Sequence, residues 1–378
     1  MNEMITYFVY ISLLIVVLLF VGLGSRKSSA YNLSFSESHL FHTNIYNLIA
    51  VLIISLIVGF RFEVGVDWKV YVAYFESIKE LSSYISYSDQ PLELGFFLIN
   101  KWIGVLGGDF QLMFLVVAFI SWYLIFQSLP SRYLPLLVFF FFVDGHFFWS
   151  MNGVRQFVAI GIWLFSIKYI ISKDLKKYTF SIFLAFLFHK SVVIFFPLFF
   201  VPYKKFKKNY IWLILYASSF LIGSSGYLKN LVESAVIWLG ERTAVFSSYL
   251  YYIDKEIFVV NESILPGFGF YFKLFVNIFI ILASKKVIEE NPKSVVYFSL
   301  FFVGAIIFNI SYNLALIGRL NIYFLIIRPI VLSLVVKQFW NTYKNKVLIL
   351  FFCGIYVLIF LNEIYSSANL CSPYQIAF

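Results

Sequence analysis

Apolar stretches, many of them close to the thickness of a bilayer, constrain this chain more than any other feature of its sequence. A transmembrane helix needs about 20 predominantly apolar residues, with a workable range of roughly 17–25. The sequence therefore predicts an all-α integral membrane protein, a polytopic helical bundle of about 10–12 spans with re-entrant or short helices between them. We expect residues 1–378 to form one transmembrane domain. The predicted spans are 5–23, 45–60, 110–128, 134–149, 154–172, 210–224, 267–284, 294–314, 320–336 and 347–365.

The composition excludes the soluble alternatives. Apolar residues make up 61% of the chain and charged residues 13%, whereas soluble domains carry about 25% charged residues. A soluble globule of this composition would expose apolar patches too large to stay dispersed, and a disordered chain would have far fewer apolar residues. Cys353 and Cys371 match no metal or redox spacing, and the sequence has no glycine-rich phosphate loop or His/Cys cluster. We therefore predict no bound cofactor and no metal.

Two apolar stretches do not have the pattern of a simple span. Residues 93–106 are short and contain Asn100 and Lys101, which favours a re-entrant or interfacial helix. Residues 178–201 are interrupted by His189-Lys190-Ser191, which predicts two short helices that meet at this tripeptide.

The net charge of +10 is mainly a topology signal, because basic residues concentrate in cytoplasmic loops. If both termini lie outside and 178–201 forms a hairpin, the inner loops hold 16 of the 29 basic residues and only four of the 19 acidic residues. The long outer segments are then about 61–92 and 225–266, and nucleic-acid binding is excluded. The inner basic residues are Arg26, Lys27, Arg132, Lys173, Lys176, Lys177, Lys204, Lys205, Lys207, Lys208, Lys285, Lys286, Lys293, Lys337, Lys344 and Lys346.

A first cluster of polar residues follows the second predicted span. If the segment from Asp67 is helical, Asp67, Tyr71 and Tyr74 share one face. Arg61 would then bind a phosphate or carboxylate while Asp67 accepts a proton. A solvated loop whose arginine anchors a helix end explains the same residues equally well.

Two further clusters lie at helix ends on the predicted outer side. Arg155, in Ser150–Gln156, begins an otherwise apolar span, where a charge is costly and usually has a partner. Its guanidinium suits a diphosphate, because it forms bidentate contacts and stays charged, although it would also snorkel to headgroups. His189 and Lys190 interrupt an apolar run. His189 is a candidate general base or a hydrogen-bonded helix terminus.

Other outer charges are weak signals when each is taken alone. Arg242 lies in the second long outer segment, and Arg319 begins a later span. Under the predicted topology these two residues and Glu93 face the same side as the three clusters. The topology itself partly imposes this convergence.

The chain resembles the EpsG-like branch of polysaccharide polymerases, which are similar to Wzy-type O-antigen and exopolysaccharide polymerases. The resemblance is good from about residue 61 to 202 and loose beyond. It departs from the family pattern at Pro91-Leu-Glu93, where a Glu-Pro pair is expected. The motifs that carry it are Arg61-x3-Gly65-x-Asp67-x3-Tyr71, Pro91-x-Glu93, Asn152-Gly-Val-Arg155-Gln156-x2-Ala159, Phe188-His189-Lys190-Ser191 and the terminal Pro373-Tyr374.

The resemblance implies a glycosyltransferase of GT-C-like architecture in a bacterial inner membrane. It would move a glycan from undecaprenyl diphosphate to the terminal sugar of another lipid-linked unit on the periplasmic face, without a metal. Its partners would be such lipid-linked glycans, membrane lipids and a chain-length regulator. The residues in named roles are Arg155, Arg61 and Arg319 for the diphosphate, Asp67 or His189 as the base, Lys190 for charge balance, and Glu93, Arg242 and Tyr71 for substrate contacts.

Three alternatives remain at this point. An O-antigen ligase differs in its acceptor rather than in its chemistry. A flippase or transporter would show paired broken segments or repeat symmetry, and the sequence has no evident repeat. A membrane acyltransferase would need its histidine to reach an acyl donor, which fits an outer His189 less easily.

Overall fold

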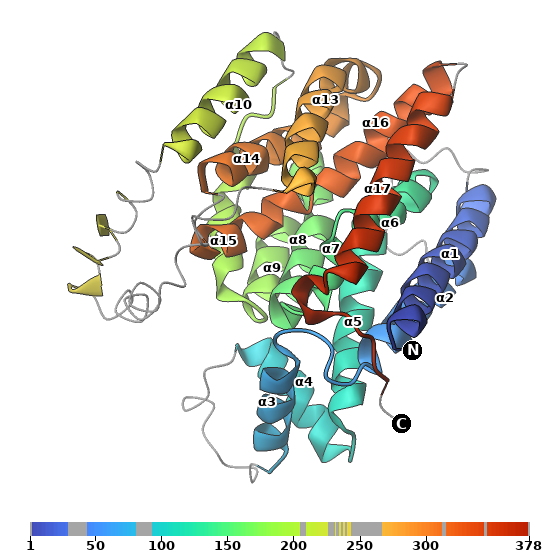
Figure 1. The fold of residues 1–378 in the computed structure, drawn as a ribbon. Helices are drawn as coiled ribbons and strands as arrows, with labels where there is room; N and C mark the ends of the chain where they lie inside the picture. The colour runs from blue at the N-terminus through green and yellow to red at the C-terminus, as the bar shows by residue number, and fades with distance from the viewer. Residues whose placement is uncertain are drawn as a thin grey trace. The chain divides into compact units, whose positions relative to one another are not determined.

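The fold is known from a computed structural model, which describes residues 2–28, 44–80, 93–204, 209–225, some positions between 231 and 242, 267–311, 315–343 and 346–376. Every regular element in these ranges is a helix (Figure 1). The chain divides into two compact units. Unit 1 is Met1–Pro202 with Val336–Phe378, and unit 2 is Tyr203–Val335. The prediction of one transmembrane domain stays a prediction.

Helix α8 is the centre of unit 1. Of the most apolar 18-residue stretch of α8, 78% is buried, whereas the same measure for α1 is 33%. Helix α8 is therefore enclosed by other helices. Helix α2 packs against α1 and α5, α5 packs against α8, and α8 packs against α9. These helices are α1 (Asn2–Ser28), α2 (Ile45–Gly59), α5 (Phe110–Phe126), α8 (Val154–Ser172), α9 (Leu175–Phe186) and, from the end of the chain, α17 (Val347–Tyr365).

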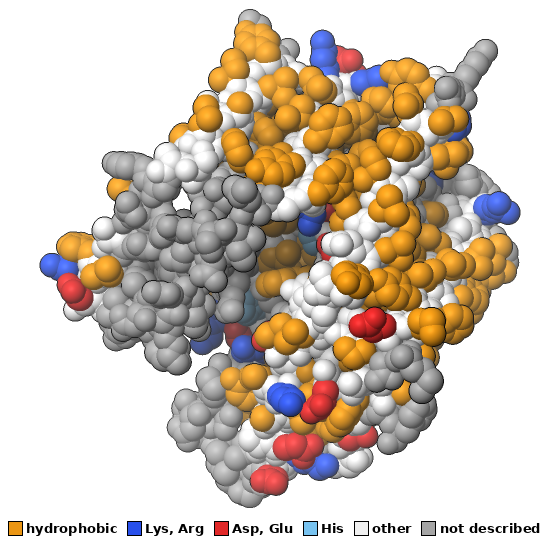
Figure 2. Space-filling view, in the orientation of Figure 1, with side chains coloured by type: hydrophobic (Ala, Val, Ile, Leu, Met, Phe, Trp, Pro, Cys, Tyr) orange, Lys and Arg blue, Asp and Glu red, His pale blue; other side chains and the backbone are white. Residues whose placement is uncertain are grey.

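The polytopic membrane class is confirmed. Among the described residues, six helices are long and apolar enough to cross a bilayer, or up to seven if a bent pair counts as one span. Four shorter apolar helices accompany them, and these include the predicted spans at 45–60 and 210–224. Apolar side chains cover most of the visible helix surfaces, while charged side chains gather around α3 and α4 (Figure 2).

The predicted span at 134–149 is wrong, because the helix is broken there. Helix α6 (Leu134–Val143) ends at Asp144-Gly145, where Gly145 adopts a left-handed φ of 84° that a continuing helix does not allow, and the short α7 (His146–Ser150) follows. A second break lies between α5 and α6, at Pro130. There the helical segments Phe110–Phe126 and Ser131–Val143 are bent by 102° relative to each other.

The two ambiguous stretches form the short helices that their sequences predict. Residues 178–201 become α9 and the 3-10 helix η3 (Lys190–Phe200), with an extended His189 between them. Residues 93–106 become α4 (Leu94–Val105), which is too short to cross a bilayer. The segment after Asp67 forms the amphipathic helix α3 (Trp68–Glu80).

Unit 2 is held together partly by buried amides. Asn277 donates to the hydroxyl of Tyr216 at 3.1 Å, and Asn309 donates to the Tyr216 carbonyl at 3.2 Å and to Ser219 Oγ at 3.0 Å. Hydrogen bonds between polar groups are the expected way to bury amides inside a membrane helix bundle. Its helices are α10 (Asn209–Ser224), α13 (Phe268–Glu290), α14 (Val295–Ser311), α15 (Ala315–Leu325) and the first part of α16 (Arg328–Thr342).

Candidate active site

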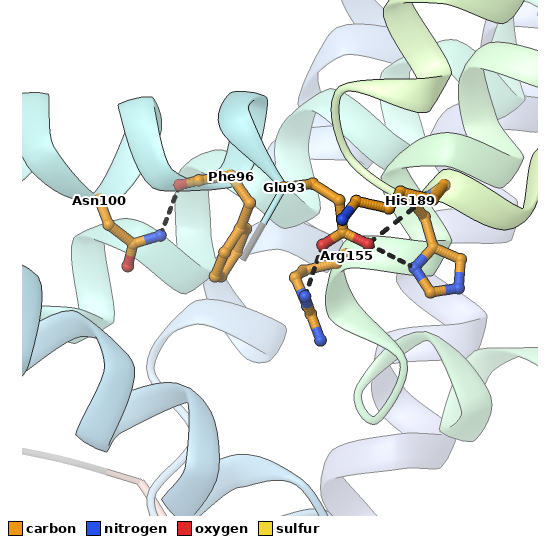
Figure 3. Close-up of polar contacts among 6 residues, drawn as sticks. Glu93, Phe96, Asn100, Arg155 and His189 are labelled. Carbon is orange, nitrogen blue, oxygen red and sulfur yellow. Dashed lines mark hydrogen bonds and ion pairs between the residues drawn. The ribbon is translucent and has the colours of Figure 1, made fainter. Parts of the chain in front are cut away.

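Glu93 connects the other residues of the candidate site to one another. It is the N-cap of α4, but its side chain makes no capping hydrogen bond with its own helix. Instead, Oε2 accepts a hydrogen bond from Arg155 Nη1 at 2.5 Å, and Oε1 lies 3.3 Å from His189 Nδ1 (Figure 3). The backbone N–H of Lys190 lies 3.5 Å from Oε1. One carboxylate therefore connects the start of α4 with the start of α8 and with the break between α9 and η3.

A close backbone contact brings α4 to that break. The N–H of Gly95, in the first turn of α4, donates to the carbonyl of Leu187 at 2.7 Å. A Cβ atom on Gly95 would lie only 2.8 Å from this carbonyl oxygen. A residue with a side chain would therefore push the two segments apart. Gly95 thus sets the distance between Glu93 and His189.

We expect Gly95→Ala to disturb the site without changing any polar group in it. The added methyl group must move α4 away from Leu187, which separates Glu93 from His189. Any activity that depends on this cluster should fall roughly 10- to 100-fold, as for a small misplacement of catalytic groups. The measurement is the initial rate of the purified protein. Gly354→Ala is a matched control, because a Cβ on Gly354 meets no atom within 4 Å. An unchanged rate for Gly95→Ala would contradict the close-contact argument.

Arg155 keeps hydrogen-bonding capacity for a ligand. Its side chain is 22% exposed and is anchored through Nη1 to Glu93. Among the described residues, its Nε atom has no hydrogen-bond partner. A guanidinium has five N–H donors in a fixed plane. Arg155 is therefore oriented by Glu93, and the exposed part of its guanidinium is open to an anionic group.

Charge neutralisation keeps the Glu93 carboxylate ionised. Burial alone would raise the pKa of Glu93, but the contact with His189 and the positive charge of Arg155 outweigh burial and lower the pKa to about 2. The carboxylate is consequently negative throughout the physiological pH range. It can accept a hydrogen bond from an N–H group of each partner.

Tyr71 supports Arg155 from α3. Its hydroxyl lies against the Arg155 guanidinium, and its ring is edge-on to Phe96 and Phe114. Burial raises the pKa of Tyr71, although Arg155 opposes this shift, so the hydroxyl stays protonated at neutral pH. Asp67 is half-buried beside Tyr71, whose N–H donates to the Asp67 carbonyl at 3.1 Å.

His189 contacts Glu93 through Nδ1, and its other ring nitrogen, Nε2, takes no part in this contact. Its backbone is extended, with φ −157° and ψ 114°, which separates α9 from η3. Nδ1 faces Glu93, and the imidazole is 29% exposed. Lys190 contributes its backbone N–H, whereas its side chain is exposed. Glu93 therefore orients the imidazole.

The predicted diphosphate role of Arg61 is corrected by its surroundings. Arg61 is completely buried, and its guanidinium donates to the carbonyls of Val64 at 3.1 Å, Val58 at 2.5 Å and Met151 at 2.9 Å. It also lies over the ring of Phe114, 4.1 Å from the centroid. Three of its five N–H donors bind backbone carbonyls and the side chain is fully buried, so Arg61 holds the protein together rather than facing a substrate.

The remaining predicted residues belong to unit 2. Arg242 makes local contacts, with the Trp238 carbonyl at 3.0 Å and with Glu241 at 3.7 Å. Arg319 lies on α15, and its side chain is outside the described part of the chain. Their substrate contacts stay predictions. The rest of the outer segments, 81–92 and most of 225–266, also lies outside the described residues.

Asn152 belongs to the family-like motif around Arg155, but the sequence predicted no role for it. It lies three positions before Arg155, and its amide joins three separate parts of the chain, as described below. An isolated asparagine in a turn has no distinctive spacing. In the described residues, no group of three or more His, Cys, Asp or Glu side chains is arranged to hold a metal ion.

A family model described as the EpsG family matches residues 44–376 of the chain. This match covers both the Glu93–Arg155–His189 cluster and unit 2. No curated protein and no solved structure matches the chain.

Proposed function

Since the chain belongs to the EpsG family, which fits a polysaccharide polymerase, we propose that it polymerises lipid-linked repeat units. The donor is a glycan on undecaprenyl diphosphate, and the acceptor is the terminal sugar hydroxyl of another lipid-linked unit. The observation that carries the proposal is the placement of Arg155 and His189 on the two oxygens of Glu93.

The chemistry requires one cation and one base. The acceptor oxygen forms a bond to the anomeric carbon of the donor while the bond from that carbon to the diphosphate oxygen breaks. The leaving diphosphate takes the electron pair. We assign Arg155 to the diphosphate, because its guanidinium is partly exposed and can stabilise charge that develops in the transition state.

Between the two candidate bases, the contacts favour His189. Nδ1 faces the ionised Glu93, and this contact favours the tautomer that carries its proton on Nδ1. Nε2 is then the acceptor that takes the proton of the sugar hydroxyl. Asp67 lies four residues before Tyr71, and its carboxylate acts on the Tyr71 hydroxyl, so we assign it a supporting position beside that residue.

We further propose that the site faces the periplasm of a bacterial inner membrane. The first part of α1, the end of α2 and the segment after α17 are joined by hydrogen bonds, for example Tyr374 N–H to Thr6 Oγ1 at 2.8 Å and Tyr374 hydroxyl to Ile57 carbonyl at 2.8 Å. These elements therefore share one end of unit 1, as the predicted topology requires. The excess of basic residues in the predicted inner loops supports the orientation.

Deletion of the gene in the native strain tests the function. We expect surface polymer to disappear while single-repeat product is retained, and we expect the reintroduced gene to restore the chain-length ladder. The surface glycan is measured by gel electrophoresis and mass spectrometry. Loss of every glycan-bearing product, single repeats included, would instead indicate a ligase or a flippase and would contradict polymerisation.

A further inference from the structure

The segment from Ser366 to Ile376, called the strap here, runs across one end of unit 1. It is tied to α1, since the Tyr10 hydroxyl donates to the Cys371 carbonyl at 2.5 Å and Tyr374 N–H donates to Thr6. It also pairs with the loop after α2, through a bridge between Arg61 and Ile376 and a bond from Phe62 N–H to the Gln375 carbonyl at 2.9 Å.

The backbone of the strap has an unusual conformation. Ser367, Asn369 and Leu370 all have positive φ, at 50°, 57° and 53°. Residues with side chains seldom adopt this region, and they stay there only when surrounding contacts impose it. Strained backbone of this kind gathers at functional sites. The strap is therefore held in place by the contacts it makes.

Asn152 connects the strap to the turn that precedes Arg155. Its Oδ1 accepts from Val66 N–H at 2.5 Å, and its Nδ2 donates to the carbonyls of Phe148 at 3.1 Å and Asn369 at 3.2 Å. The amide thus links the loop after α2, the turn between α7 and α8, and the strap. Arg61 reinforces the same junction through the Met151 carbonyl.

The junction lies directly before the proposed diphosphate-binding residue. Gly153 is the N-cap of α8, and Arg155 is in the first turn of that helix. A helix start has no internal partners for its first N–H groups, so contacts from outside the helix define where it begins. Movement of Asn152 would be transmitted to Arg155 over a few residues of backbone.

We propose that the strap helps to form the active site. Asn152 is the positioning residue through which the strap places Arg155. This inference rests on the proposed function for the role of Arg155, whereas the closure of the strap is independent of it. A loose strap would leave Arg155 paired with Glu93 but misplaced relative to the diphosphate.

Cys371 offers a direct probe of strap closure. It is 1% exposed, and burial raises the pKa of its thiol to about 12, so it reacts slowly while the strap is closed. The chain has two cysteines, so Cys353→Ser leaves Cys371 as the single thiol. The rate of maleimide alkylation of the detergent-solubilised protein then measures how often the strap opens.

Asn152→Ala in this background should open the strap. We expect alkylation of Cys371 to accelerate roughly 5- to 10-fold, because the strap loses the hydrogen bond to the Asn369 carbonyl and the contact with Cys371 Sγ, and kcat for polymerisation to fall. Asn277→Ala is the matched control, because it removes another buried amide, in unit 2, and should leave the alkylation rate unchanged. If Asn152→Ala does not accumulate, Tyr374→Phe removes only the hydrogen bond to Ile57 and should accelerate alkylation roughly five-fold.

A double-mutant cycle separates positioning from general destabilisation. In an Arg155→Lys background, Asn152→Ala should lower kcat much less than in the unaltered protein, because both changes act through the same guanidinium. Faster alkylation with unchanged kcat, unchanged alkylation, or additive losses in the cycle would each overturn the proposal. Normal activity of Arg155→Ala would instead overturn the proposed function while leaving the alkylation result intact.

Discussion

Arg155→Ala should abolish the long-chain polymer while single-repeat product persists. The change removes the guanidinium that we assign to the leaving diphosphate, and the loss of one preorganised charge-stabilising group costs on the order of 10²- to 10³-fold in kcat. It also leaves the carboxylate of Glu93, which is 7% exposed, without its cation. The measurements are the chain-length ladder in cells at matched expression and the initial rate of the purified protein.

Two further variants make the Arg155 result specific. Arg155→Lys keeps the charge but lacks the planar pair of donors, so we expect activity between those of the unaltered protein and the alanine variant. Arg132→Ala is the matched control, because Arg132 is exposed on η2 (Ser131–Tyr133), where it lies over the ring of Tyr133. Ladders of normal length from Arg155→Ala at matched protein level would refute its diphosphate role.

Glu93→Gln should be nearly as damaging, although the side chain keeps its shape. The amide has one acceptor oxygen where the carboxylate has two, so it cannot accept from Arg155 and His189 together. The imidazole then loses the contact that selects its tautomer. We expect kcat to fall on the order of 10²- to 10⁴-fold, as when a base loses its orienting carboxylate.

The stability that Glu93 contributes to the folded protein should decrease as the pH falls. The surroundings of Glu93 lower its pKa to about 2 from the ordinary value of 4.5, so its stabilising contribution is complete above pH 4.5 and declines as the pH falls toward 2. The melting temperature of Glu93→Gln should therefore lie below that of the unaltered protein at pH 7, and the gap should narrow at pH 3. A gap that widens in acid would contradict the ion-pair interpretation.

A double-mutant cycle with His189→Gln tests whether the two residues act together. If Glu93 acts through His189 and Arg155, the second substitution should add little to the loss from the first. Fully additive losses would mean that His189 works independently of Glu93. Asp67 would become the preferred base only if His189→Gln by itself left kcat nearly unchanged.

Local sequence patterns predicted several elements of the fold correctly. The break at His189-Lys190-Ser191 separates α9 from η3, because charged and polar residues interrupt an otherwise apolar run. The short, polar-containing stretch at 93–106 became the short helix α4. The span at 134–149 was mispredicted because hydropathy does not register the backbone break at Asp144-Gly145 inside an apolar run.

The candidate site was predicted less completely than the fold. Arg155 and His189 stand out as polar residues in apolar stretches, and the structure brings both to one carboxylate. Arg61 has the same signature of a rare charge at a helix end, yet its guanidinium is satisfied by backbone carbonyls. Rarity of charge identifies residues that need partners, but it does not say whether the partner is a substrate or the protein.

The sequence by itself determined the membrane class, most of the helices and a short list of candidate residues, since these depend on the apolar character of neighbouring residues along the chain. The family motifs added the proposed chemistry. Only the tertiary structure decided that Glu93 joins Arg155, 62 positions away, and Lys190, 97 positions away, in one cluster. Such contacts depend on how helices pack and on close approaches such as that of Gly95 to Leu187, which leave no local pattern in the sequence.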